Sequence, residues 1–472
     1  MLFSSVTFLF YFFTLLLAAY FLVPKRFRAA RNAVLLIFSL TFYAFGGVKY
    51  LFFMILEILL AYVSGLMCDS KSHNVKKFGL IFGILSGLIM LAYFKYLGFF
   101  SETANAINSS VPIVEIVLPV GISFYTFQSL SYVIDVYRGD SKVQKNPFYL
   151  ALYVSLFPQL IAGPIVRYSD VAEEITHRDE NLDEFYAGCI RFMMGFGKKM
   201  ILANTAGEIA DAVFAVPHAD LSVSLAWVGA LAYTAQIYFD FSAYSDMAIG
   251  LGRMFGFHFL ENFNYPYIAK SITEFWRRWH ISLSTWFRDY VYIPLGGNRC
   301  APIRHVLNIC IVWVATGFWH GASWNFIVWG AYFAVILLIE KYLLKNILEK
   351  IPGFIRHIYT MLLVIISWVI FRAPDLQSAL SYLGTMFGFD GHALYSGDAI
   401  YYIRQYIPEW ILFIVCALPV TKWIRSYFAH REDKLSKLLV DLVPAIFALL
   451  VFGIGYLRLS VGSFNPFIYF RF

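Results

Sequence analysis

Long runs of apolar residues alternate with short polar segments along most of the chain. Several runs reach the roughly 20 residues that a helix needs to cross a bilayer. Three clear examples are VTFLFYFFTLLLAAYFLV at residues 6–23, FGLIFGILSGLIMLAYFKYLGFF at 78–100 and VDLVPAIFALLVFGIGYL at 440–457. Counting such runs predicts about 10–12 transmembrane helices, with the divisions in the middle of the chain left open.

One apolar run is interrupted by residues that break helices. FYLALYVSLFPQLIAGPIV, residues 148–166, contains Pro158 and the pair Gly163–Pro164. Proline lacks a backbone N–H and its ring clashes with the preceding turn, so the run predicts a kinked or re-entrant segment. IRFMMGFGKKMILA, residues 190–203, fits either a span or a helix in the membrane interface.

The longest polar stretch runs from Arg253 to Arg304 and holds seven basic but three acidic residues. This excess of positive charge predicts a cytoplasmic segment, and its many Trp, Tyr and Phe residues suit the membrane interface. Ser271 followed by Glu274 is a capping-box pattern, so we expect a helix to begin near Ile272. PLGGN at residues 294–298 predicts a turn.

Composition agrees with a membrane protein. The chain is 60% hydrophobic and 14% charged, whereas a soluble domain carries roughly 25% charged residues. The net charge of +7 could suit a nucleic-acid partner, but basic residues of membrane proteins usually mark cytoplasmic loops, so we expect no nucleic acid. The five cysteines form no CxxC pair, which argues against a disulfide framework or a zinc site. We expect one polytopic, all-α domain over residues 1–472.

Loop charges predict the topology. Residues 1–23 contain no basic residue, and PKRFRAARN at 24–32 follows with four, which differs from a cleavable signal peptide. We therefore expect the N-terminus outside and this loop in the cytoplasm of a multi-pass cytoplasmic-membrane protein. By the same rule KNILEKIPGFIRH and HREDKLSK are predicted inside, and SETANAINSSVP, FDGHALYSGDAIYY and the C-terminal NPFIYFRF are predicted outside.

Ionisable groups within apolar runs are the first candidate functional residues. QIYFDFSAYSDMAIG at 236–250 places Asp240 and Asp246 among other polar side chains. Such groups are costly in a membrane and usually face a cavity or a partner. Two interpretations follow: a polar wall of a substrate tunnel, or a hydrogen-bond network that holds helices together.

His320 is the only titratable residue in TGFWHGASWNFIVWG, residues 316–330. An imidazole can be neutral near pH 7 and accept a proton, and the small neighbours Gly321 and Ala322 leave space beside it. It could equally be a structural histidine. Metal ligation is less favoured, because no HxxxH or HExxH pattern accompanies it and zinc takes three or four ligands. We therefore expect no metal site.

Five long motifs follow one another along the chain: LPVGISFYTFQSLSYVIDVYRGD, FPQLIAGPIVRY, QIYFDFSAYSDMAIG, ENFNYPYIAKSITEFWRRWHISLSTWFRDYVYIPLGGNR and TGFWHGASWNFIVWG. Taken in order, they resemble the membrane-bound O-acyltransferase family. The branch most similar in these motifs contains bacterial proteins that O-acetylate alginate and other cell-surface glycans. The resemblance covers nearly the whole chain, with core motifs over roughly residues 118–330.

The resemblance implies a fold and a set of site residues. Family helices form a ring around a thin centre, with a funnel and a tunnel that meet near a catalytic histidine. His320 in WHG matches that histidine, and His280 in RRWH matches a second one. Ala243 stands where the family pattern DFSGYS has Gly, which is a small departure. Trp319, Trp324 and Asn325 are further candidates for substrate binding.

The implied chemistry is transfer of an acyl group from a thioester to a hydroxyl. A cytoplasmic donor, acetyl-CoA or an acyl carrier protein, would meet an acceptor from the outer side, with no bound cofactor. Neutral His320 would take the hydroxyl proton. Arg277 and Arg278 are candidates to bind the donor's phosphates, since arginine suits phosphate geometry, although both also fit ordinary inside-positive charge.

Three other functions remain open from the sequence. A transporter would also have many spans and intramembrane acids, but we find no pair of corresponding broken segments in two halves. A non-catalytic scaffold would tolerate replacement of His320. A family enzyme could instead transfer D-alanine from a carrier protein to teichoic acid. The resemblance also implies a serine-hydrolase-like partner outside the membrane and leaves the acceptor glycan unnamed.

Overall fold

The computed structural model describes residues 1–429, 434–462 and 465–468, which are predominantly helical and contain no strand. This result confirms the all-α class. The chain divides into two compact units, Met1–Phe192 with Ser245–Leu260, and Met193–Tyr244 with Glu261–Phe472. Because the division cuts through the continuous helices α10 (Leu182–Gly197) and α12 (Val223–Met254), both helices belong to both units. The single-domain organisation stays a prediction.

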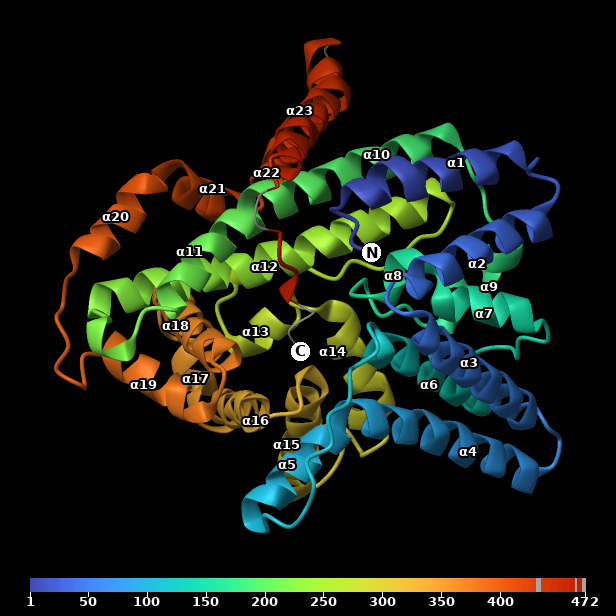
Figure 1. Cartoon of the computed structure of the whole chain (residues 1–472), viewed down its shortest axis with the longest axis horizontal. Coiled ribbons are helices and arrows are strands. Elements are labelled where there is room, and N and C mark those ends of the chain that lie inside the picture. The colour runs from blue at the N-terminus through green and yellow to red at the C-terminus, as the bar shows by residue number, and fades with distance from the viewer. Residues whose placement is uncertain (430–433, 463–464, 469–472) are drawn as a thin grey trace. The chain divides into compact units, whose positions relative to one another are not determined.

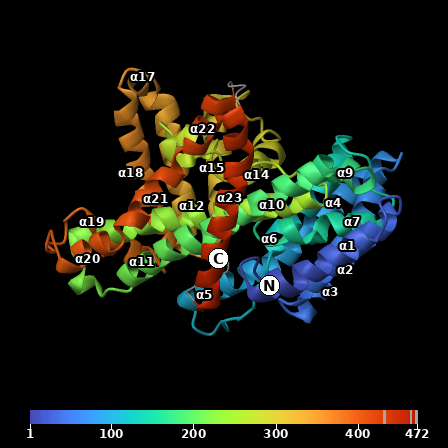
Figure 2. The same cartoon turned by 90° about the horizontal axis from the view of Figure 1, so that it is seen from above.

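The first unit contains the N-terminal helices. Figure 2 shows α1, α2 and α3 side by side, and α3, α4 and α6 also pack together. Besides α10, its α-helices up to Phe192 are α1 (Phe13–Leu22), α2 (Arg28–Ala44), α3 (Val48–Cys68), α4 (His73–Leu91), α5 (Leu97–Ile107), α6 (Ile122–Arg138), α7 (Pro147–Ser155), α8 (Phe157–Leu160) and α9 (Tyr168–Thr176).

Small residues bring α3, α4 and α6 close together (Figure 1). A Cβ added to Gly83 of α4 would lie 2.9 Å from Cβ of Ser64 and 2.9 Å from a methyl of Val133. Close approach through small residues is the usual way in which helices associate where lipid removes the hydrophobic driving force.

Buried charge fixes the basic loop that follows the first apolar run. Glu180, which is 2% exposed at its side chain, pairs with Arg28, Arg31 and Arg178. Arg178 also donates to Oδ1 of Asn32 at 2.7 Å. A buried carboxylate needs such partners, because its desolvation is otherwise uncompensated. The predicted loop charge therefore has a structural role, whichever side of the membrane it faces.

The interrupted run at residues 148–166 is broken, as predicted. α7 ends at Ser155, Leu156 is extended, α8 is a single turn, and residues 163–167 are not helical. The Phe157 N–H donates to Oγ of Ser39 at 3.1 Å. Buried protein surroundings thus satisfy irregular backbone that lipid could not.

The second unit contains the segments with both candidate histidines. Figure 1 shows α11 in green and the helices from α13 onward in colours from yellow through orange to red. Besides its share of α10 and α12, they are α11 (Asn204–Phe214), α13 (Ile272–Trp276), α14 (Ile281–Phe287), α15 (Pro302–His320), α16 (Trp324–Ile339), α17 (Lys345–Leu348), α18 (Gly353–Arg372), α19 (Leu376–Met386), α20 (Gly397–Gln405), α21 (Ile407–Ala417), α22 (Val420–Ala429) and α23 (Lys434–Ser460).

The polar stretch between Arg253 and Arg304 follows its local signals. α13 begins at Ile272, where Oγ of Ser271 accepts from the N–H of Glu274 at 3.0 Å. The Glu274 carboxylate accepts instead from the Lys270 N–H at 2.9 Å, one residue earlier than the capping-box pattern predicts. Gly296 and Gly297 both have positive φ and form the predicted PLGGN turn.

Five helical stretches among the described residues are long and apolar enough to cross a membrane. They are Val48–Cys68, His73–Ile107, Trp324–Leu348, Gly353–Arg372 and Leu442–Ser460. The protein is therefore a multi-pass membrane protein. The count of about 10–12 spans, the ring of helices and the side of each loop stay predictions. HREDKLSK and NPFIYFRF lie partly outside the described residues, which omit 430–433 and 469–472.

Two glycines let α15 and α16 pack against each other. A Cβ on Gly317 would lie 2.2 Å from the carbonyl oxygen of Phe326, and one on Gly330 would lie 2.3 Å from that of Trp313. Both obstacles are backbone atoms, so a larger residue would force the helices apart. This contact sets the position of the end of α15.

Gly330→Ala tests this packing. Because the new methyl meets backbone, we expect it to destabilise the protein by about 1–3 kcal/mol and to lower activity as α15 shifts. Gly453→Ala in α23 is the matched control, since nothing lies within 4 Å of its added Cβ. Thermal unfolding in detergent measures both. Equal stability of the two variants would contradict the close approach.

Candidate active site

His320 is the last residue of α15 and is buried. The helix ends there because Gly321 adopts an extended conformation, with φ −164° and ψ 151°. A Cβ at position 321 would come within 2.1 Å of the Phe326 ring, so glycine lets that ring pack beside the helix end. The His320 imidazole therefore lies at the point where the helix ends and the chain becomes extended.

Aromatic rings from three helices surround the imidazole. Its ring centroid lies 4.9 Å from Trp319 of α15, 5.1 Å from Trp329 of α16 and 5.3 Å from Phe371 of α18, each near perpendicular. His320 faces a cavity of about 10 Å³, which is the room of about one water molecule. The other lining residues are Ile237, Phe241, Trp279, Trp329, Trp368, Phe371 and Ile468.

His280 lies beside this wall in a strained backbone conformation. It precedes α14 with φ 44° and ψ 54°, one of two non-glycine residues with positive φ among those described. Its ring packs 4.6 Å from Phe241 and 6.1 Å from Trp319. The two histidines therefore share aromatic neighbours: Trp319 packs against both rings, and Phe241 packs against His280 and lines the His320 cavity. Such strain persists where surroundings enforce it, often at functional sites.

One nitrogen of His280 is held and the other is not. Nδ1 lies 3.1 Å from Oδ1 of Asn262, which also accepts from the N–H and hydroxyl of Ser282. Since that oxygen is an acceptor, we assign the proton to Nδ1. Nε2 then carries a lone pair, and it has no hydrogen-bond partner among the described residues. Burial lowers the pKa of His280 to about 3, so the ring is neutral at pH 7.

Asp240 lies in a buried ion pair next to the same cavity. Its carboxylate pairs with Nζ of Lys199 at 2.6 Å and accepts from the Ile468 N–H at 2.8 Å. Lys199 also donates to the carbonyl of Pro466. The pair thus fastens residues 465–468, and the Ile468 side chain lines the His320 cavity.

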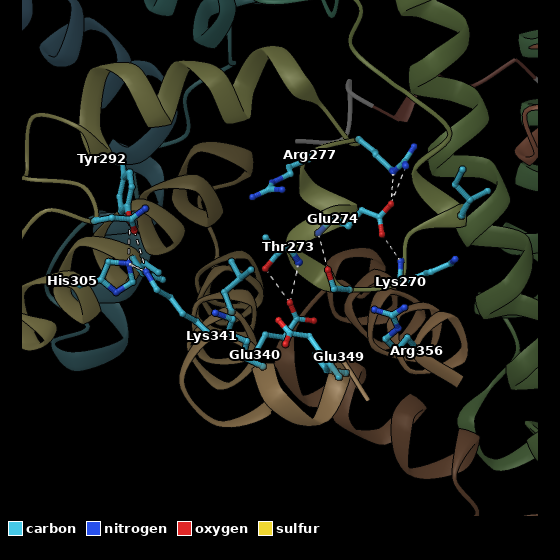
Figure 3. Close-up of a pocket in the computed structure, with 18 residues that line it drawn as sticks. Lys270, Thr273, Glu274, Arg277, Tyr292, His305, Glu340, Lys341, Glu349 and Arg356 are labelled. Atoms are coloured by element: carbon cyan, nitrogen blue, oxygen red, sulfur yellow. Dashed lines mark hydrogen bonds and ion pairs between the residues drawn. The ribbon is translucent and has the colours of Figure 1, made fainter. Parts of the chain in front are cut away.

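Arg277 and Arg278 line a separate, larger cavity of about 840 Å³. Arg278 pairs with Glu274 at 2.8 Å and donates to the Asn264 carbonyl. Arg277 is exposed, and no hydrogen bond or ion pair of its guanidinium occurs within the described part of the chain. Figure 3 shows Arg277 apart from the dashed contacts that join its neighbours. One arginine is therefore neutralised and the other is available to an anion.

Glu340 fixes the floor of this cavity. Its carboxylate accepts from the N–H of Ile272 at 2.7 Å and from the N–H and hydroxyl of Thr273, both at 3.0 Å (Figure 3). These bonds hold the start of α13 against α16 and so position the turn that carries Arg277. On the opposite wall, Nζ of Lys341 lies 2.7 Å from Nε2 of His305.

A third cavity of about 260 Å³ lies between the large cavity and α15. It shares Thr273, Arg277 and Tyr292 with the large cavity. It also reaches Thr316, one helical turn before His320. The basic cavity and the adjoining 260 Å³ cavity therefore lie in the same unit as the buried imidazole, and the smaller cavity reaches the helical turn that precedes it.

The remaining predicted residues have different positions. Trp324 is 57% exposed and does not line the His320 cavity. Asn325 is buried and donates to the Ala373 carbonyl at 2.9 Å, which ties α16 to the end of α18. Asp246 belongs to the first unit, where it pairs with Arg191 at 2.9 Å. Trp319 touches both histidines.

Several residues of the site were not predicted from the sequence. Asn262 and Trp279 stand inside quoted motifs, and only Trp279 had a local signal, its position next to His280 in RRWH. Trp368 and Phe371 come from α18, outside every motif, and Glu340 lies at the polar end of an apolar run. No local pattern indicates which distant helix supplies such partners.

Comparison with known proteins gives the family. Residues 142–383 match the model of MBOAT, the membrane-bound O-acyltransferase family. A probable alginate O-acetylase of Azotobacter vinelandii is 41% identical, with 100% of both chains covered. A peptidoglycan O-acetyltransferase of Helicobacter pylori is 33% identical, over 100% of this chain and 98% of its own.

A teichoic acid D-alanyltransferase of Bacillus subtilis is a more distant relative, 30% identical over 48% of this chain and 60% of its own. The family region includes both candidate histidines, both arginines and Asp240. Full-length similarity at these identities confirms the resemblance that the motifs indicated. The chain therefore belongs to the membrane-bound O-acyltransferase family, in the branch that contains the alginate O-acetylases, and it is a multi-pass membrane O-acyltransferase.

Proposed function

We propose that this enzyme takes an acetyl group from a cytoplasmic thioester for the O-acetylation of an extracytoplasmic polysaccharide, with His320 as its catalytic base. The observation that carries the proposal is the placement of His320, buried at the end of α15 one helical turn after Thr316, which lines a cavity that adjoins the basic cavity of Arg277. The names of the full-length relatives, an alginate O-acetylase and a peptidoglycan O-acetyltransferase, support the acetyl group and the glycan.

One imidazole, that of His320, takes up and returns the proton in the transfer step. A ring nitrogen of His320 takes the proton of the acceptor hydroxyl while the oxygen attacks the thioester carbonyl. The tetrahedral intermediate collapses, the C–S bond breaks, and the imidazolium returns the proton to the leaving thiolate. General-base catalysis of this kind contributes about 10²–10⁴-fold, so positioning within the aromatic wall supplies much of the remainder.

Arg277 is the better candidate of the two arginines for the donor. It is exposed to two adjoining cavities and its guanidinium has no ion pair within the described residues, whereas Arg278 is paired with Glu274. A coenzyme A or a carrier's phosphopantetheine presents phosphates that an unpaired guanidinium binds well. Acetyl-CoA is our proposed donor, with an acyl carrier protein as the alternative.

On the acceptor side we propose a relay. The acetyl group passes to a serine-hydrolase-like acetyltransferase outside the membrane, which then modifies the cell-surface glycan. The N-terminus outside and the Arg277 cavity inside belong to the same proposal, because they place the donor where metabolism supplies it.

The rival functions are weaker. Membership in an acyltransferase family argues against the transporter and the scaffold. D-alanyl transfer rests on a relative that matches less than half of this chain.

His320→Gln is the decisive variant for the catalytic role. It keeps most of the volume and some hydrogen bonding but cannot act as the base, so acyl transfer should fall by about 10²–10⁴-fold. His320→Ala should lower acyl transfer to a similar extent. The effect of His280→Ala on acyl transfer is less predictable, because this variant also loses the bond to Asn262. The measurement is glycan O-acetyl content per membrane protein, with exposed His73→Gln as control. If His320→Gln is present in the membrane at its normal level and the glycan is acetylated normally, His320 is not the base.

Variants of the Asp240–Lys199 pair distinguish the two interpretations of Asp240, a polar wall of a substrate tunnel and a structural hydrogen-bond network. Asp240→Asn leaves a buried ammonium without its charge partner, which typically costs about 3–5 kcal/mol. Combined Asp240→Leu and Lys199→Met removes both charges and should recover much of the stability that Asp240→Asn loses, because no uncompensated ammonium remains, with activity following the membrane level of the protein. Membrane level and O-acetyl content check this expectation. A stable but inactive double variant would show instead that the polar wall serves the reaction.

Arg277→Ala should weaken donor binding. Loss of one charge-assisted contact is expected to raise the KM for acetyl-CoA about tenfold with kcat little changed. Arg278→Ala is the matched control and should change KM less, because its guanidinium is committed to Glu274. Steady-state kinetics on purified protein without a carrier protein distinguishes them. A strict need for an acyl-loaded carrier would move the donor to that alternative.

A further inference from the structure

Two histidines and an aspartate meet at a place that acyl transfer does not use. His218 lies in the connection between α11 and α12, and Asp390 and His392 lie in the connection between α19 and α20 (Figure 1). The side chains of His218, Asp390 and His392 are 47%, 23% and 18% exposed, so an ion can reach them from solvent. All three belong to the second unit.

The potential ligand atoms have the spacing of a metal site. Nε2 of His218 lies 3.4 Å from Oδ2 of Asp390, and Nε2 of His392 lies 4.0 Å from the same oxygen. The three atoms are all within 4.8 Å of one another. Tetrahedral zinc with bonds of about 2.0–2.1 Å places neighbouring ligand atoms ~3.3 Å apart. The separation of 3.4 Å is close to this spacing, and zinc binding requires His392 to move nearer to Asp390.

The surrounding groups orient these ligands. Nδ1 of His392 lies 2.6 Å from the carbonyl oxygen of Leu221, so it donates and leaves the Nε2 lone pair directed to the cluster. The hydroxyl of Thr385 donates to Oδ2 of Asp390 at 2.6 Å. A second N–H bonded to a carbonyl is typical of metal-bound histidine, and a hydrogen-bonded carboxylate is typical of such sites.

The backbone holds the two connections together next to the cluster. The N–H groups of Val223 and Ser224 donate to the carbonyls of Ala393 and Leu394, both at 3.0 Å. The hydroxyls of Ser222 and Ser396 are 2.9 Å apart. The ligands are thus presented on a framework that is already closed, which lowers the conformational cost of binding an ion.

We propose that His218, Asp390 and His392 bind one Zn²⁺ ion, with water in the fourth position. The ion joins the α11–α12 and α19–α20 connections as a structural clip. The sequence predicted no metal site because it offers no short histidine pattern, and here the ligands come from segments far apart in the chain. This site is independent of the proposed acetyl donor and base.

A hydrogen-bonded cluster without metal is the competing explanation. Nε2 of His218 also lies 3.1 Å from Oγ1 of Thr385 and 3.3 Å from the carbonyl of Ser381. These two groups and Asp390 could share its proton. The two explanations differ in what happens when zinc is added, because a proton-sharing cluster gains no stability from the ion.

Zinc titration of the full-length protein, purified without a polyhistidine tag and stripped with EDTA, tests the proposal. One equivalent of Zn²⁺ should bind and raise Tm, and Co²⁺ should give the visible bands of a tetrahedral site. His392→Ala and Asp390→Asn should each weaken zinc binding at least about tenfold. Asp390→Asn keeps an oxygen that accepts from the Thr385 hydroxyl, so the variant should stay folded and a loss of zinc binding can be attributed to the ligand.

His73→Ala removes an exposed histidine from the start of α4 and is the matched control. It should bind zinc like the unaltered protein. No zinc-dependent rise in Tm in the stripped protein, or equal zinc binding by Asp390→Asn, would overturn the site. The zinc assays measure binding and Tm, whereas the test of His320 measures O-acetylation, so O-acetylation measured on the same variants distinguishes failure of one proposal from failure of the other.

Discussion

Burial of charge with a partner is the constraint on which this structure depends. A chain with 14% charged residues still buries carboxylates, and several of them connect segments that are far apart in the sequence. Glu180 holds the basic loop after the first apolar run, Glu340 holds the start of α13, and Asp240 with Lys199 holds residues 465–468. Removal of one partner would leave an uncompensated charge, so these contacts are obligatory rather than additive.

The same constraint gives the two histidines different roles. His280 is fixed through Nδ1 by Asn262 in a conformation that few non-glycine residues adopt, and only its Nε2 remains to meet another group. His320 is held by aromatic edges and faces at the end of a helix. These aromatic contacts help to orient its ring, which suits the proposed role of a base whose protonation changes during the reaction.

Local signals predicted local structure well. The helix start after Ser271, the break near Pro158 and the PLGGN turn were all confirmed, because each depends on residues within a few positions of one another. Tertiary partners were not predictable. Trp324 is exposed although it shares a motif with His320, and α18 supplies Trp368 and Phe371 without any motif. Apolar periodicity predicts which face of a helix is buried, but it does not predict which other helix packs against that face.

The size of the His320 cavity bears on how the proposed reaction avoids hydrolysis. A base beside a thioester activates water as readily as a hydroxyl, so discrimination has to come from access. The cavity has room for about one water molecule, and large rings such as Trp279, Trp329 and Trp368 form much of its wall. Little water can therefore stand beside the imidazole, and a substrate that fills the cavity excludes it. The aromatic wall that hides the histidine is thus also what makes transfer, rather than hydrolysis, the expected outcome.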